Sequence, residues 1–140
     1  MNDHLRKRLI LHSGMVIMLG MLSGIPLAMS LLGSMATQVS DWKISHMEGL
    51  TNGLLMLAIA SCASLLSLSS RQASLLFYSI VFTGYSNALY GWARGLSGNA
   101  GMDLAPPFSN QLVALLGGLP IFTAFLAIGL LMYGAAKKSA

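Results

Sequence analysis

Four long apolar segments dominate the sequence and decide what it can fold into. They cover about residues 9–33, 47–68, 73–93 and 111–133. About 20 apolar residues cross the hydrocarbon core of a bilayer as a helix, so each segment is long enough to span a membrane. Only 9% of the residues are charged, whereas a soluble domain carries about a quarter. We therefore predict an all-α, integral membrane four-helix bundle, with residues 1–140 forming one domain.

The basic residues predict how this bundle is oriented. If both termini lie on one side, that side holds most of them, namely Arg6, Lys7, Arg8, Arg71, Lys137 and Lys138. The other side holds only Lys43 and Arg94. The positive-inside rule then places both termini in the cytoplasm, as in a multi-pass protein of a bacterial inner (plasma) membrane. The first segment is longer than the apolar core of a signal peptide, so we expect it to be retained as a helix.

Other features of the composition exclude several classes of protein. The net charge of +4 is divided between the two ends of the chain, and no helix carries a basic stripe, so we expect no nucleic-acid partner. Cys62 is the only cysteine, which excludes disulfides, paired redox cysteines and thiolate metal sites. Trp42, between the first two segments, suits the aromatic belt at a membrane surface.

Polar side chains gather at one predicted depth in the second and third segments. Asn52 lies six residues below the outer end of the second segment, or about 9 Å. Asn87 lies about 12 Å below the outer end of the third. The whole set in the outer half of the membrane is His46, Glu48, Asn52, Asn87, Tyr90 and Arg94. Ionisable groups inside a bilayer cost free energy and usually mark a site, so we predict one here.

Helical spacing sorts these residues into faces. His46, Gly49 and Gly53 follow the i, i+3, i+7 pattern of one face. The two glycines leave a groove beside the histidine that either a flat ligand or a neighbouring helix would fill. Gly20 and Gly24, in the first segment, have the small-xxx-small spacing that allows two helices to approach closely.

The other polar residues lie on two further faces. Glu48 and Asn52 are i, i+4 neighbours on an adjacent face of the second helix. Asn87, Tyr90 and Arg94 share a face of the third. We expect Arg94 to pair with Glu48, which would lower the cost of both charges.

Each of these residues also has a simpler structural interpretation. His46 suits a helix end that faces water, and Glu48 suits the positive end of the helix dipole. Asn52 and Asn87 suit hydrogen bonding between helices, and Tyr90 suits an interfacial belt.

Two motifs resemble known membrane enzymes. The segment from His46 to Gly53 (His-Met-Glu-Gly-Leu-Thr-Asn-Gly) resembles the His-Leu-Glu-Gly-x-x-Asn-Gly motif of the hydroxylaminobenzene mutases, which are small four-helix membrane proteins. The wider pattern resembles styrene oxide isomerase. It comprises His12-Ser13-Gly14, a histidine with an asparagine six residues later, and Gly84-Tyr85-Ser86-Asn87.

The resemblance implies an isomerase that uses haem b as a Lewis acid at the subunit interface of a trimer. His46 would be the axial iron ligand and Asn52 a substrate-positioning donor. From helical spacing we add Gly49 and Gly53 as candidate cofactor-binding residues. From the shared depth of the polar groups, the candidate catalytic residues are Asn52, Glu48, Asn87, Tyr90 and Arg94. The isomerase tyrosine follows the asparagine of the third helix by four residues, whereas Tyr90 follows Asn87 by three. This difference in spacing, together with Glu48, favours a mutase over an epoxide isomerase.

Our leading hypothesis is therefore a membrane mutase that converts an arylhydroxylamine to an aminophenol. The first alternative is isomerisation of an epoxide to an aldehyde, and a small aromatic substrate dissolved in the bilayer suits either reaction. A small multidrug transporter is disfavoured because the first segment lacks a carboxylate. A haem subunit for electron transfer is disfavoured because His12 and His46 lie at opposite membrane faces. A purely structural membrane subunit is the remaining alternative.

Overall fold

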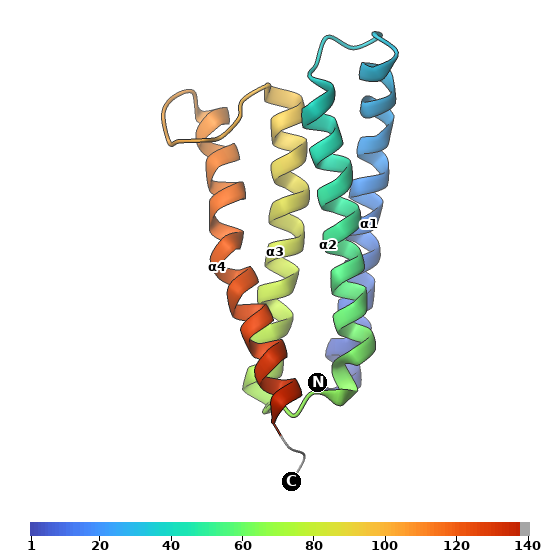
Figure 1. Ribbon diagram of the computed structural model, residues 1–140, viewed down its shortest axis with the longest axis vertical. Coiled ribbons are helices and arrows are strands. Elements are labelled where there is room, and N and C mark those ends of the chain that lie inside the picture. Colours follow the sequence, from blue (N-terminus) through green and yellow to red (C-terminus); the bar gives the residue numbers. More distant parts are fainter. Residues whose placement is uncertain (138–140) are drawn as a thin grey trace.

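The computed structural model describes residues 1–137, which form an antiparallel bundle of four long helices (Figure 1). The elements are α1 (Asp3–Leu31), α2 (Val39–Cys62), the short 3-10 helix η1 (Ala63–Leu65), α3 (Ser70–Ser97) and α4 (Phe108–Ala136). The N-terminus and the end of α4 lie at the same end of the bundle. The predicted all-α four-helix bundle is confirmed. The side of the membrane on which the termini lie stays a prediction, and Lys138 lies outside the described residues.

Three of the helices in residues 1–137 are long and apolar enough to cross a membrane, namely α1, the stretch Val39–Leu65 and α4. The chain is thus a multi-pass membrane protein. The remaining helix, α3, packs against α1, α2 and α4. Three of its polar side chains, those of Ser79, Thr83 and Ser86, are buried, and Thr83 Oγ1 lies 2.8 Å from Thr123 Oγ1 of α4. A helix whose polar groups face neighbouring helices needs fewer apolar residues. That α3 crosses the membrane stays a prediction.

The helices extend beyond the apolar segments that predict them. α2 begins at Val39, eight residues before the predicted span, because a helix continues where its side chains leave the hydrocarbon. α3 begins with a capping box in which Ser69 and Gln72 satisfy each other's free backbone N–H groups. It ends at Gly98, whose φ of 68° is the left-handed conformation that glycine adopts at little cost.

The contact between α1 and α2 is made by glycine backbones. A Cβ on Gly20 would lie 2.7 Å from the backbone nitrogen of Leu50, so a larger residue would not fit. Farther along the same contact, Ser13 Oγ donates a hydrogen bond of 2.8 Å to the carbonyl oxygen of Gly53. The tight packing predicted from the glycine spacing is confirmed, and it joins two helices of the same chain.

The contact between α2 and α3 fixes their antiparallel register. Gly91 packs on the backbone of Ser45, and Gly95 packs on the indole of Trp42. Trp42 is 1% exposed and lies edge-on against Trp92, with 5.3 Å between the ring centroids. The prediction that Trp42 belongs to an interfacial belt is therefore wrong, because Gly95 leaves room for the indole inside the bundle.

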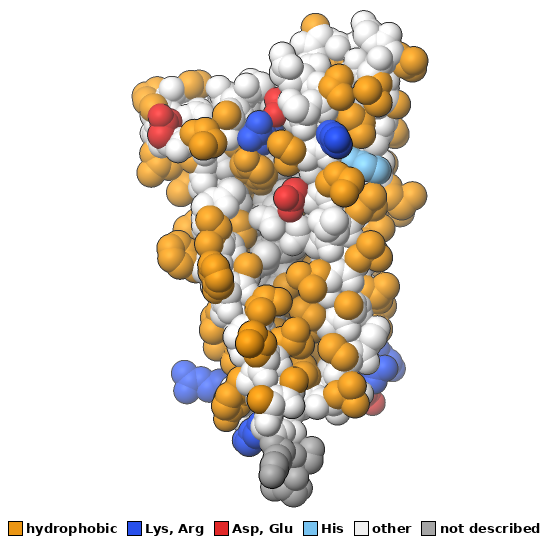
Figure 2. All heavy atoms as spheres, viewed as in Figure 1, with side chains coloured by type: hydrophobic (Ala, Val, Ile, Leu, Met, Phe, Trp, Pro, Cys, Tyr) orange, Lys and Arg blue, Asp and Glu red, His pale blue; other side chains and the backbone are white. Residues whose placement is uncertain are grey.

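The surface has the distribution of side chains that a bilayer requires. Apolar side chains cover the flank of the bundle, and basic side chains gather at the end that holds the termini (Figure 2). On α4, Phe122 and Phe125 are more than three-quarters exposed. Such exposure would be costly in water, so these faces are suited to lipid.

Candidate functional site

A chain of polar contacts joins α2 to α3 in the upper half of the bundle. The Asn52 amide nitrogen donates to the Glu48 carboxylate at 2.8 Å and to the Glu48 carbonyl oxygen at 2.9 Å. The Asn52 amide oxygen accepts from the amide nitrogen of Asn87 at 3.2 Å. Asn52 and Asn87 therefore meet at one depth, as predicted. The nitrogen and the oxygen of the Asn52 amide both have hydrogen-bond partners, whereas Asn87 keeps a second N–H for another acceptor.

A cavity of about 710 Å³ lies beside this chain, between α2, α3 and α4. Its polar lining residues are Glu48, Asn87, Tyr90 and Asp103. The loop from Gly101 to Leu104 forms part of its lining, as do apolar residues of α4 that include Leu115, Leu119 and Phe122. This combination of an apolar wall with a few converging polar groups is typical of a small-molecule site.

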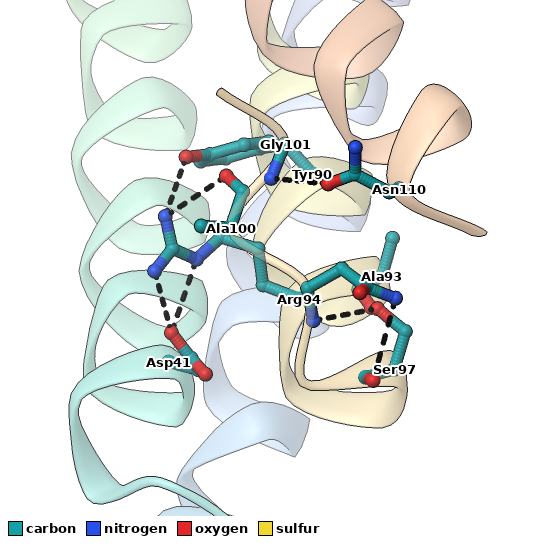
Figure 3. Close-up of polar contacts among 9 residues, drawn as sticks. Asp41, Tyr90, Ala93, Arg94, Ser97, Ala100, Gly101 and Asn110 are labelled. Carbon is teal, nitrogen blue, oxygen red and sulfur yellow. Dashed lines mark hydrogen bonds and ion pairs between the residues drawn. The ribbon is translucent and has the colours of Figure 1, made fainter. Parts of the chain in front are cut away.

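Arg94 contacts Tyr90, which lines the cavity, but it does not pair with Glu48. Its Nη2 and Nε donate to one carboxylate oxygen of Asp41 at 2.7 and 3.0 Å, as Figure 3 shows. The expected Arg94–Glu48 pair is thus wrong. The early start of α2 brings Asp41 level with Arg94, and among residues 1–137 this is the single ion pair between side chains.

His46 faces away from the cavity. A helix turns about 200° over two residues, so His46 and Glu48 point to opposite sides of α2. The Nδ1 atom of His46 lies 2.8 Å from the carbonyl oxygen of Gly20, and Gly24 leaves room beside the ring. The groove left by Gly49 and Gly53 is filled by α1, the second of the two occupants considered above. A role of Gly49 and Gly53 in cofactor binding stays a prediction.

The environment of His46 suits a haem ligand. A carbonyl oxygen only accepts hydrogen bonds, so Nδ1 carries a proton, and in the neutral ring Nε2 is the nitrogen with a lone pair for a metal. Donation of Nδ1–H to a carbonyl is the arrangement that orients metal-binding histidines. Within residues 1–137, no group of three His, Cys, Asp or Glu side chains could hold a bare metal ion. A single neutral histidine is a common protein ligand of haem iron.

His12 lies at the contact between α1 and α3. It is half-buried, and its Nδ1 lies 3.1 Å from the hydroxyl of Tyr85 on α3. Tyr85 also contacts Met15, so this pair forms a separate polar contact between α1 and α3. Neither His12 nor Tyr85 lines the cavity.

Comparison with known families decides the class of the chain. The family model of styrene oxide isomerase matches residues 5–136. The chain belongs to the styrene oxide isomerase family. This membership makes the chain a membrane isomerase, and the match extends over all four helices. No curated protein matches the chain. Of the two resemblances seen in the sequence, the styrene oxide isomerase family is therefore confirmed, and a mutase activity stays a prediction.

Several residues of the site escaped prediction. Asp41 lies in a polar segment that looked like a loop, so nothing linked it to Arg94. Gly117 of α4 packs against the ring of Tyr90, but a glycine in an apolar segment carries no signal of its own. The loop from Gly101 to Leu104 lines the cavity because of the way α3 packs against α4. Helical periodicity in the sequence does not reveal that packing.

Proposed function

We propose that the protein isomerises a small aromatic epoxide of the styrene oxide type to the corresponding aldehyde. The family match over residues 5–136 carries the proposal, because it includes every helix that lines the cavity. It favours this reaction over the arylhydroxylamine rearrangement that motif and spacing had put first. The cavity supports the proposal through the O–H and N–H donors and the apolar side chains of α4 that line it.

The reaction needs no partner for electrons or atoms. The benzylic C–O bond breaks, a hydride moves from the carbon that keeps the oxygen to the benzylic carbon, and a C=O bond forms. As the ring opens, the oxygen gains negative charge, which the Tyr90 hydroxyl and the free N–H of Asn87 would stabilise by hydrogen bonding. The apolar side chains of α4 would exclude water, which otherwise traps the benzylic cation as a diol.

A second candidate function is the mutase reaction of an arylhydroxylamine. Glu48 favours it, because its carboxylate lines the cavity and Asn52 fixes its orientation. Cleavage of an N–O bond leaves positive charge on the nitrogen and ring, and a carboxylate beside the ring would stabilise that charge. Glu48 is also part of the segment that resembles the mutase motif.

His46 is the residue that would hold haem b. When bound, the haem iron supplies Lewis acidity toward the substrate oxygen. Because His46 and the cavity lie on opposite sides of α2, we propose a homo-oligomer, with a trimer implied by the resemblance. In it, the His46 side of one copy would face the cavity of the next.

The test is an assay of the haem-loaded protein with styrene oxide and hydroxylaminobenzene in parallel. We expect phenylacetaldehyde from styrene oxide, and a loss of about 100-fold in kcat for Tyr90→Phe, the usual effect of removing one donor to a developing oxyanion. Tyr78→Phe is the matched control, because Tyr78 lies on the same helix with its side chain 59% exposed. Conversion of hydroxylaminobenzene alone would favour the mutase, and conversion of neither substrate would refute both functions.

A further inference from the structure

Arg94 contacts three parts of the molecule, namely the first part of α2, Tyr90 on its own helix α3, and the loop that follows α3. Its guanidinium donates to Asp41 near the start of α2, to the Tyr90 hydroxyl at 2.9 Å, and to the carbonyl oxygen of Ala100 at 3.3 Å (Figure 3). The side chains of Arg94 and Asp41 are 17% and 8% exposed. Little water reaches this pair, so its geometry is determined by the protein.

The contact with Arg94 determines which way the Tyr90 hydroxyl donates. Arginine has only donors, so the Tyr90 oxygen must accept the bond from Arg94. Within residues 1–137, the hydroxyl proton of Tyr90 has no acceptor of its own. Tyr90 lines the cavity, and its proton is therefore available to a ligand there.

The ring of Tyr90 is held as firmly as its hydroxyl. A Cβ on Gly117 of α4 would lie 2.9 Å from Cε2 of Tyr90, so the ring fills the space that glycine leaves. The Arg94 guanidinium carbon lies 5.6 Å from the ring centroid, within the range of a cation–π contact. Tyr90 is thus fixed by α4 on its ring and by Arg94 at its oxygen.

We propose that the Asp41–Arg94 pair and Gly117 are positioning elements that fix Tyr90 as an O–H donor to the oxygen of the substrate. The proposal deepens the proposed function and rests on it. Asp41 holds the guanidinium through two donors, and the third nitrogen is then directed at Tyr90. An alternative role, in which Arg94 only joins the ends of α2 and α3, makes different predictions.

The experiment measures binding, which does not depend on turnover. Acetophenone offers an oxygen acceptor on an aromatic ring, and ethylbenzene offers a similar shape without the acceptor. Affinities of the detergent-purified full-length protein for both are measured by calorimetry. We expect Tyr90→Phe to weaken acetophenone binding about tenfold and to leave ethylbenzene binding unchanged, as for the loss of one hydrogen bond.

Arg94→Gln and Asp41→Asn should reproduce this selective loss, and Arg94→Lys should restore part of it. The double variant Tyr90→Phe/Arg94→Gln should bind acetophenone no more weakly than Tyr90→Phe, because both changes remove the same interaction. The matched control is Arg71→Gln, an exposed arginine near the start of α3, which should bind both ligands normally.

Equal weakening of both ligands by Arg94→Gln, or additive losses in the double variant, would overturn the proposal in favour of a purely structural pair. If Arg94→Gln does not fold, Gly117→Ala decides instead, because its Cβ would displace the Tyr90 ring. Gly117 also lines the cavity, so only a loss that is selective for acetophenone supports the proposal. Normal acetophenone binding by Gly117→Ala would also overturn the proposal. Absence of turnover in the wild-type protein would refute the proposed function alone, since the binding comparison still tests the positioning of Tyr90.

Discussion

The contact between α1 and α2 gives the sharpest test of how the bundle is built. In Gly20→Ala, the new Cβ would lie 2.7–2.9 Å from backbone atoms of Gly49 and Leu50, whereas ordinary contacts are 3.4 Å or more. The obstacle is backbone, which no rotamer change relieves, so α2 must move by roughly 0.7 Å. Overpacking of this kind costs about 1–3 kcal/mol, and we expect the free energy of unfolding to fall by about 2 kcal/mol.

The assay is reversible unfolding of the purified protein in mixed micelles, followed by helix content. Gly14→Ala and Gly129→Ala are matched controls, because a Cβ at either position has nothing within 4 Å. Both lie in exposed parts of helices, where alanine is favoured over glycine by up to about 1 kcal/mol, so neither should destabilise the protein. If Gly20→Ala were as stable as these controls, the close backbone contact of α1 and α2 would not determine the stability of the bundle.

Two further predictions concern the cofactor and the assembly. His46→Ala should abolish a Soret band in protein from haem-replete cells, whereas His12→Ala should keep it, because His12 instead contacts Tyr85. A band that survives in His46→Ala would refute ligation by His46. Co-expression of His46→Ala with Tyr90→Phe should restore part of the activity that each lacks, because mixed oligomers join an intact histidine to an intact cavity. Activity no higher than that of the separate variants would mean that each site lies within one chain.

The fold was predictable because four apolar segments leave a membrane chain few choices. The depth of the polar residues was predictable for the same reason, since antiparallel helices of known rise must bring Asn52 and Asn87 together. The ends of the helices were not predictable, because hydropathy indicates which residues contact hydrocarbon and not where a helix begins or ends. The segment 39–46 is polar, and it is nevertheless helical.

This extension of α2 explains why the partner of Arg94 was wrong. Eight added residues lengthen the helix by about 12 Å, which raises Asp41 to the level of Arg94. Glu48 is then free to contact Asn52 and to line the cavity. Because the predicted start of α2 was too late, Glu48 was expected to be the partner of Arg94. In the structure Asp41 is that partner, and the Glu48 carboxylate lines the cavity instead.

Helical spacing predicted which residues share a face, but not what each face meets. His46, Gly49 and Gly53 do share a side of α2, and α1 covers much of it. The Nδ1 atom of His46 is bound to Gly20 at the edge of that contact, while Glu48, two positions later, lines the cavity on the other side of α2. A site that needs both His46 and Tyr90 cannot close around one copy of α2. For that reason an assembly of several chains is part of the chemistry we propose, and not an addition to it.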